Sequence, residues 1–408
     1  MIVFINRSKS GNTRESKTGY ETYFKGVVIM QKDFHYDVVY VLAQWAGYSV
    51  AESDTIAHSS QYVDDAIHSG VVKFTNGAMF SRVSSAHSAF DLCHNINEIE
   101  DQFVWVPFHF LPGNLGLPVG QAAERDMMDR LICYPNSYIG REMVLECLKQ
   151  KGSRTDLHRL GITLHIYADS WAHQGFSGII SKKNQIKNLQ YKESGTGIVK
   201  VVDEFILKAE DKTHAWINTC LPLGHGAVLT YPDLPYVSEW SFEYEDGRDP
   251  GIGAENFLKR NNIELFIDAA DHIYKTLCLF KQGTIPGEIE TMFDMTIGLS
   301  EEQKQILRKT FTSFTGHETE IRHTDWQREI NSHSIPGVDE IPEYYKQGKK
   351  SWEYLALGTE LDVHQLEQTV EYTDAFLLSD WKLFHDALQI HRTYILNELL
   401  PKYGICTV

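Results

Sequence analysis

The chain has 408 residues, of which 42% are hydrophobic and 23% are charged. This composition supplies enough apolar surface to offset the entropy of ordering a large core, so it excludes a globally disordered chain. The formal net charge of −17 excludes a protein whose whole surface tracks a nucleic-acid backbone or an anionic membrane, because the long-range force would be repulsive. A polyanionic substrate would need a local cationic site, which bound divalent metal ions could supply.

The N-terminal segment and the cysteines bear on the cellular compartment. Residues 1–29 contain only a short apolar stretch and no small-residue cleavage site, so no secretory signal is predicted. We expect this segment to be a poorly ordered or artefactual extension. No apolar run elsewhere reaches membrane-spanning length. The six cysteines are widely spaced and none forms a CxxC pair, which indicates reduced thiols and a cytoplasmic protein.

Two helices and a hairpin are predicted at the start of the patterned region. Apolar residues recur at helical spacing over residues 33–47. Ser49, with Glu52 three residues on, forms a capping box that begins a second helix running up to Gly70. The Asn-Gly dipeptide at 76–77 lies between β-prone runs and predicts a tight hairpin.

The rest of the chain is predicted to be mainly helical. From period and capping residues, further helices are expected at 86–99, 137–151, 156–174, 253–281, 300–314 and 368–399. The expected fold class is a mainly α, bundle-like single domain of many helices with a small β-hairpin and long loops. Within it we expect a helical metal-site domain over residues 30–299 and a helical C-terminal subdomain over residues 300–408 packed on it.

The segment most informative about function lies in the predicted helix 156–174. His165, Asp169 and His173 follow one another at intervals of four residues, so the three share one helical face about 80° wide. Imidazole and carboxylate are the ligands expected for zinc or a similar divalent metal, and an intervening Asp could bridge two ions. His158 lies on a similar face as a weaker candidate. The alternative is a helix whose histidines are satisfied by hydrogen bonds in a polar interior.

Four other segments carry ligand-type residues, each with a structural alternative. His35 lies at the start of the first helix, where capping or a surface position is the alternative. Asp64 and Asp65 end an otherwise apolar helix face, so either a cation neutralises them or they face water. His109 stands in an extended apolar run, where a backbone hydrogen bond is the alternative. His225 lies between two glycines, which permit either close approach to a ligand or a tight turn.

Several of these segments together resemble known proteins: FHYDVVYVLA, SSQYVDDA, VPFHFLPG, HIYADSWAH and GHGAVLTYPDLP. HIYADSWAH resembles the superfamily of zinc-dependent phospholipases C and single-strand nucleases, which are helical and hold a trinuclear zinc cluster. It is also similar to a motif of the heterokaryon-incompatibility proteins. Over residues 33–235 the chain more closely resembles an uncharacterised bacterial family.

The resemblance implies that His165 and Asp169 are ligands of a shared cluster, with Asp169 bridging, and that His173 binds a second ion. His35 would correspond to the histidine near the start of the mature enzymes. The other implied ligands match by residue type and order: Asp64 or Asp65, His109 and His225. The chain departs from the superfamily in two ways. It has residues before His35, where those enzymes use a freed N-terminal amine, and the gap between Asp169 and His173 is shorter.

Three functional hypotheses follow. The leading one is a metal-dependent hydrolase of phosphoric esters with two or three divalent ions, zinc foremost, in which Asp169 and either Asp64 or Asp65 orient the attacking water. The alternative is a non-catalytic, metal-stabilised structural or interaction module, for example in microbial conflict. The third is an HD-type phosphohydrolase site at His385 and Asp386. A GxGxxG after a strand and a GKS or GKT loop are absent from the sequence, which argues against nicotinamide and P-loop nucleotide enzymes.

Overall fold

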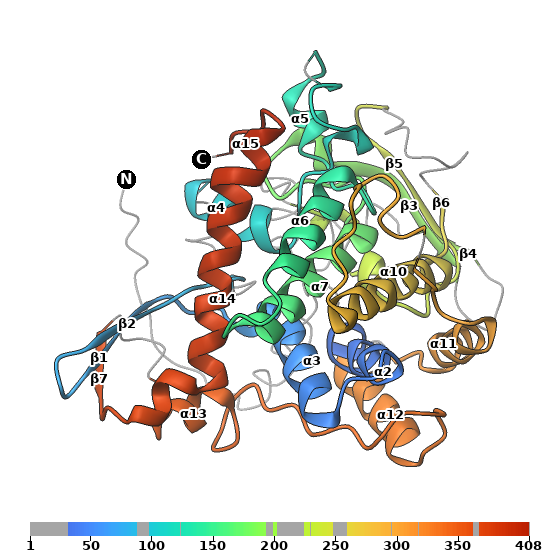
Figure 1. Cartoon of the computed structure of the whole chain (residues 1–408). Helices are drawn as coiled ribbons and strands as arrows, with labels where there is room; N and C mark the ends of the chain where they lie inside the picture. Colours follow the sequence, from blue (N-terminus) through green and yellow to red (C-terminus); the bar gives the residue numbers. More distant parts are fainter. Residues whose placement is uncertain are drawn as a thin grey trace, which may run out of the picture.

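The structure is a computed structural model of the whole chain (Figure 1). It describes residues 32–87, 98–122, 124–192, 199–201, 224–228, 230–247, 259–294, 296–316, 318–361 and 367–407. The predicted extension at residues 1–29 therefore lies outside the described residues. The described part is predominantly helical and contains two small sheets, which lie on opposite sides of the helical body in Figure 1.

One central helix organises the fold. Every residue of α7 (Asp156–Ala172) from His158 onward is buried, as in a helix enclosed on all sides. Four helices pack against it (Figure 1): α3 (Val50–Asp65), α6 (Tyr138–Lys149), α10 (Asn262–Gln282) and α14 (Asp380–Tyr394). Polar side chains on α7 are consequently held in the middle of the molecule, away from bulk water.

The N-terminal helices confirm the sequence prediction, with one refinement. A π-helical segment, η2 (Asp33–Val38), continues directly into α2 (Val39–Trp45). Helix α3 begins with the predicted capping box between Ser49 and Glu52. It ends at Asp65 rather than at Gly70, because Gly70 already begins a strand.

The predicted hairpin is present within a three-stranded sheet. Strands β1 (Gly70–Phe74) and β2 (Met79–Arg82) pair antiparallel across the Asn-Gly turn. The third strand, β7 (Glu367–Val370), runs parallel to β1. The helix predicted over 368–399 is therefore wrong at its start. Its first residues form this strand, and α14 begins only at Asp380, after the N-cap Ser379.

A second sheet was not predicted. Its strands are ordered β4-β3-β5-β6 and all pair antiparallel: β3 (Ile186–Lys192), β4 (Val199–Val201), β5 (Trp240–Tyr244) and β6 (Lys259–Arg260). In β5 the aromatic residues Trp240, Phe242 and Tyr244 are buried and alternate with polar ones, which is the period-two pattern of a half-buried strand. They form a second core together with Phe176, just beyond the end of α7.

The remaining helices are α4 (Glu98–Phe108), α5 (Met127–Arg130), α11 (Glu301–Ser313), α12 (Thr319–Asn331), α13 (Trp352–Leu357), a π-helical segment at Ile395–Leu399 and α15 (Leu400–Lys402). The expected extended run before His109 is wrong, because α4 continues through Pro107 to Phe108. Trp326 of α12 and Phe384 of α14 lie in the same core cluster as Leu164 of α7. Within the described residues, none of the helices is both long and apolar enough to cross a membrane.

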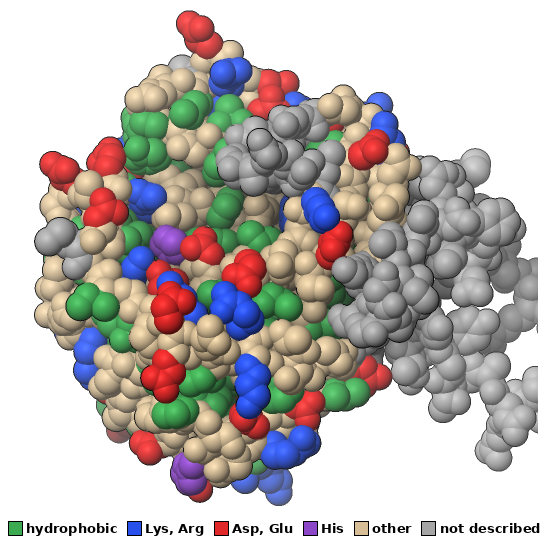
Figure 2. Space-filling view, turned by 90° about the vertical axis from the view of Figure 1, so that its right-hand side faces the viewer, with side chains coloured by type: hydrophobic (Ala, Val, Ile, Leu, Met, Phe, Trp, Pro, Cys, Tyr) green, Lys and Arg blue, Asp and Glu red, His purple; other side chains and the backbone are tan. Residues whose placement is uncertain are grey.

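Figure 2 shows acidic and basic side chains mixed with hydrophobic ones over one face of the molecule, so the net charge of −17 is not spread as a uniform field there.

The contact between α3 and α7 depends on a glycine. A Cβ added at Gly161 would lie 2.3 Å from the carbonyl oxygen of Ile56 and 2.6 Å from Cβ of Ser59. The missing side chain therefore lets the two helices approach closely. We expect Gly161→Ala to lower the free energy of unfolding by about 1–3 kcal/mol through overpacking, as measured by chemical denaturation.

A matched control is Gly140→Ala in α6, where the new Cβ would make an ordinary contact of 3.4 Å with the Tyr167 ring. That change should stay within about 1 kcal/mol of the parent protein. Equal effects of the two substitutions would contradict the close-approach argument.

Candidate metal centre

The candidate site is built on one carboxylate of the central helix. Asp169 and His165 face the same side of α7 one turn apart, and both are fully buried. Nε2 of His35, from η2, lies 3.2 Å from Oδ1 of Asp169. Nε2 of His165 lies 3.3 Å from Oδ2 of the same carboxylate. The His35 and His165 rings stack at a centroid distance of 3.8 Å. These three side chains form the first group that could hold a metal ion.

A second group shares His165 and adds residues from α3 and α4. Nδ1 of His109, the residue that follows α4, lies 3.2 Å from both Nε2 of His165 and Oδ2 of Asp169. Oδ1 of Asp64 lies 3.7 Å from His165 Nε2 and 3.9 Å from His109 Nδ1. Neither oxygen of Asp64 has a hydrogen-bond partner among the described residues, although the side chain is only 8% exposed. Asp64, His109 and His165 could therefore hold an ion together.

A third group lies at the C-terminal end of α7. His173 directly follows the helix, and its Nε2 is 3.5 Å from Oδ1 of Asp233. Nε2 of His225 is 3.5 Å from the other oxygen, Oδ2. Both oxygens of Asp233 are buried without a hydrogen-bond partner in the described part of the chain. The sequence reasoning missed Asp233, and the only signal was its place in the same short segment as His225, GHGAVLTYPD.

The structure thus brings seven of the eight predicted ligands into these three groups. The eighth, Asp65, lies apart from them. Its Oδ2 accepts hydrogen bonds from the Tyr344 hydroxyl at 2.6 Å and the Gln61 amide at 3.2 Å, and Lys346 pairs with Oδ1 at 2.6 Å. Adjacent residues near a helix end point in directions about 100° apart, so only one of the two acids reaches the cluster.

Backbone carbonyls fix which ring nitrogens of two histidines face the site. Nε2 of His109 lies 2.9 Å from the carbonyl oxygen of Ser85, and a carbonyl can only accept, so this nitrogen carries a proton. In the same way, Nδ1 of His173 donates to the carbonyl oxygen of His109 at 2.8 Å. Ser85 is itself held, because its amide donates to Ala66 and its hydroxyl to Val63. Orientation of this kind is typical of ligating histidines.

Burial disfavours the charged forms of several side chains in this cluster and shifts their pKa values. It lowers the pKa of His109 to about 4 and that of His165 to about 4. Burial raises the pKa of Asp64 well above its usual value, and the neighbouring charge of Asp169 adds to the shift. For Asp169 the surrounding histidines outweigh burial and hold its pKa well below the usual range. Burial also lowers the pKa of His173, but Asp169 and Asp233 outweigh it and raise the value overall.

Comparison with known proteins gives one decisive match, because a family model covers residues 30–399 of the chain. The chain belongs to the DUF6765 family. This family is described as one of unknown function. Neither the curated proteins nor the solved structures contain a match. All three candidate groups of this DUF6765 protein lie inside the matched region.

The weaker predicted candidates of the DUF6765 chain lie elsewhere. His158 pairs with Asp380 at 3.0 Å, near the start of α14. Nδ1 of His385 accepts a hydrogen bond from the amide of Val83, and Asp386 pairs with Lys382 on the surface of α14. The adjacent His-Asp pair thus serves two separate contacts within the described structure.

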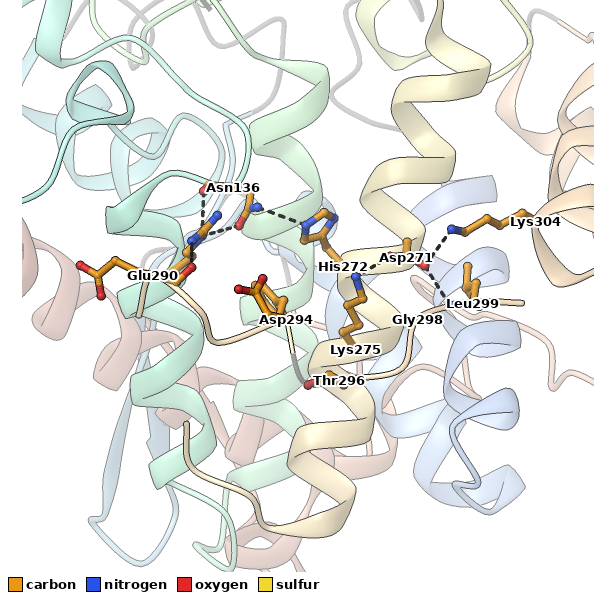
Figure 3. Close-up of a pocket in the computed structure, with 12 residues that line it drawn as sticks. Asn136, Asp271, His272, Lys275, Glu290, Asp294, Thr296, Gly298, Leu299 and Lys304 are labelled. Carbon is orange, nitrogen blue, oxygen red and sulfur yellow. Dashed lines mark hydrogen bonds and ion pairs between the residues drawn. The ribbon is translucent and has the colours of Figure 1, made fainter. Parts of the chain in front are cut away.

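A polar pocket of about 320 Å³ lies on the far side of α7 in the DUF6765 protein (Figure 3). Its lining residue Asn136 accepts a hydrogen bond from the Tyr167 hydroxyl at 2.8 Å and contacts His272 Nε2 at 3.1 Å. Nearby, Asp268 accepts from the Trp171 indole at 2.7 Å. Tyr167 and Trp171 lie on the face of α7 opposite His165 and Asp169. These contacts fix the rotation of α7 and thereby the direction of its ligands.

Proposed function

We propose that the chain binds two or three divalent metal ions, zinc foremost, at this cluster and uses them to hydrolyse a phosphoric ester. One observation carries the proposal. Neutral His109 donates its one N–H, at Nε2, to the carbonyl oxygen of Ser85, so Nδ1 carries a lone pair. This nitrogen lies 3.2 Å from Oδ2 of Asp169, which also has only lone pairs to offer. Nε2 of His165 also lies 3.2 Å from Nδ1 of His109. A cation between these atoms converts mutual repulsion into shared coordination.

The spacing of the ligand atoms supports this interpretation. Two atoms bound to the same tetrahedral zinc ion at about 2.0–2.1 Å lie roughly 3.3 Å apart. The corresponding separations are 3.2 Å for His35 with Asp169, 3.3 Å for His165 with Asp169, and 3.5 Å for His173 with Asp233. Burial and the charge of Asp169 raise the pKa of Asp64, which opposes its ionisation, and a divalent cation at the cluster would favour the ionised form of this carboxylate.

The number of ions depends on His165. Its Nε2 has a single lone pair and can bind only one ion, although it belongs to two of the groups. The arrangement that uses every ligand places one ion between His35 and Oδ1 of Asp169, and another among Oδ2 of Asp169, Asp64, His109 and His165. Asp169 would then bridge the two. A third ion would lie among His173, His225 and Asp233.

Divalent ions held in this way would supply Lewis-acid catalysis for the hydrolysis of phosphoric esters. The residues of the chain would hold the ions in place, orient the attacking water molecule and keep other water out of the site. Asp64 is the carboxylate available to orient an attacking water, because Asp65 is engaged by Tyr344 and Lys346.

The direct test is metal analysis of the purified protein followed by assays on phosphodiester, phosphomonoester and phospholipid substrates with zinc, manganese or a chelator. At least two ions per chain together with activity that the chelator abolishes would support the hydrolase. Metal well below one ion per chain would refute it.

Burial favours a second candidate, the metal-stabilised module without turnover. Structural zinc sites are closed, whereas catalytic ones keep an open position. The most accessible ligands, Asp64 and His225, have side chains only 8% and 9% exposed. Tightly bound metal without activity on any of the three substrate classes would favour this module over the hydrolase.

The metal-free protein should lose stability on mild acidification. The pKa values of His109 and His165 are about 4 in the folded chain and about 6.5 when unfolded. Their contribution is therefore complete above pH 6.5 and is lost as the pH falls toward 4. At pH 5 we expect a loss of about 2 kcal/mol per imidazole, opposed in part by Asp64, whose raised pKa acts in the other direction. Urea unfolding at pH 5 and pH 7 with chelator measures this, and equal stability at both would contradict it.

A further inference from the structure

A second buried charge lies on α7, outside the candidate metal centre. Arg159 is 2% exposed, and its Nε, Nη1 and Nη2 atoms all lack a hydrogen-bond partner among the described residues. A guanidinium group carries five N–H donors and stays protonated in proteins. Buried cations are ordinarily paired with an anion, because an unpaired charge in the interior strongly destabilises the fold. Arg159 therefore needs a negative partner.

Further buried polar groups lie on the elements around Arg159. Thr163 is one turn further along α7 and is fully buried, and the Cys147 thiol is the polar neighbour of its hydroxyl among the described residues. On α14, His391 donates from Nε2 to the carbonyl of Pro107, while its Nδ1 is unpartnered within the same described residues. Electrostatic interaction with Arg159 lowers the pKa of His391 further, although burial is the main cause.

The described groups near Arg159 do not neutralise its charge. Glu146 on α6 accepts a hydrogen bond from Gln150 at 3.0 Å and pairs with Lys149 at 3.5 Å, so it is engaged on the surface of α6. Burial raises the pKa of the neighbouring Cys147 thiol to about 11, which keeps it neutral. Tyr394 on α14 interacts with Arg159 electrostatically, but burial raises its pKa and keeps the phenol neutral as well. Among the residues that the structure describes, none supplies the missing negative charge, so we look for it in a bound anion.

We propose that Arg159 and Thr163 bind a small monovalent inorganic anion, chloride in the cell, between α6, α7 and α14. The guanidinium N–H groups and the threonine hydroxyl would donate to it. Arg159 lies in the first turns of α7, where the positive end of the helix dipole also favours an anion. Arg159 is 2% exposed and interacts with Cys147 of α6 and Tyr394 of α14, and a group so buried favours a halide over a phosphate ester or a larger carboxylate. The anion would tie α14 and α6 to the helix that carries Asp169, and its binding does not depend on the metal.

Bromide identifies such a site directly. In crystals of the full chain grown with bromide in place of chloride, we expect an anomalous peak within hydrogen-bonding distance of the Arg159 guanidinium. A water molecule there, without a bromide peak, would overturn the proposal. This measurement uses the parent protein, so it decides the question even if a variant fails to fold.

The second measurement is the melting temperature with sodium chloride or sodium gluconate at equal ionic strength. Chloride at ten times its dissociation constant should raise the melting temperature of the parent protein by about 2 °C. Arg159→Met should lose this difference, whereas the exposed matched control Arg154→Met should keep it. A chloride effect that survives in Arg159→Met, or that is absent from the parent protein, would refute the site.

Discussion

Asp169→Asn is expected to lower the bound metal by about two ions per chain, because the carboxylate that contacts His35, His109 and His165 is lost. The variant should still fold. An asparagine amide is nearly isosteric with the carboxylate and can donate to the imidazole lone pair that Asp169 now opposes. Elemental analysis after dialysis and thermal melts with and without chelator give the two readouts.

The expected pattern separates metal loss from unfolding. The parent protein should lose about 4 kcal/mol of stability on chelation if the metal is present at a thousand times its dissociation constant. Asp169→Asn should respond far less. The matched control is Asp65→Asn. This substitution changes the acid next to Asp64, but the Asp65 side chain contacts Tyr344 and Lys346 and not the cluster. Full metal content in Asp169→Asn, or equal loss in the control, would remove the basis for a shared cluster.

Arg322→Met is expected to lower the free energy of unfolding by about 3–5 kcal/mol, because it leaves Asp33 as an unpaired buried carboxylate. The guanidinium donates to both oxygens of Asp33 at 2.8 and 3.0 Å, and both side chains are at most 2% exposed. One residue on, His323 contacts Asp37 at 2.8 Å. These two pairs hold η2 on either side of His35. Urea unfolding measures the loss.

The same helix offers a control. Arg328 pairs with Asp325 at 2.8 Å on the surface of α12, with the arginine 70% exposed. Arg328→Met should change stability by no more than about 1 kcal/mol. If metal binds as proposed, Arg322→Met should also weaken the ion beside His35 more than the ion held by His173, since only η2 is displaced. A loss below that of Arg328→Met would show that the buried pair does not stabilise η2.

Local rules predicted the hairpin and most of the helices, because capping and period depend on neighbouring residues. The helix predicted over 253–281 begins only at Asn262, since Lys259 and Arg260 form β6, and most of the helix predicted over 86–99 lies outside the described residues. The Ser49–Glu52 box and the Asn-Gly turn appear as expected. The parallel strand β7 could not be predicted this way. Its position beside β1 depends on pairing between Val71 and Glu367, which are about 300 residues apart in the sequence. The second sheet was missed although Trp240, Phe242 and Tyr244 alternate, because the segment is short and surrounded by loops.

The candidate site likewise has some features that neighbouring residues predict and others that depend on contacts between distant parts of the chain. Helical spacing alone placed His165 and Asp169 on one face. It could not decide between Asp64 and Asp65, because that depends on where α3 ends and how it packs against α7. Nor could it identify Asp233, which is a candidate ligand because its two oxygens each lie near a histidine, His173 and His225. Such choices follow from tertiary packing and not from residue type.

The support of η2 by α12 has a consequence for synthesis on the ribosome. Every ligand of the cluster has been translated by residue 233, whereas Arg322 and His323 emerge some ninety residues later and β7 later still. Proteins are made from the N-terminus at about 5–20 residues per second. The acidic and imidazole side chains of the cluster would therefore be synthesised several seconds before the residues of α12 that support η2. A nascent chain stalled before α12 should therefore be protease-sensitive around His35, and this sensitivity should vanish once the C-terminal helices have been released.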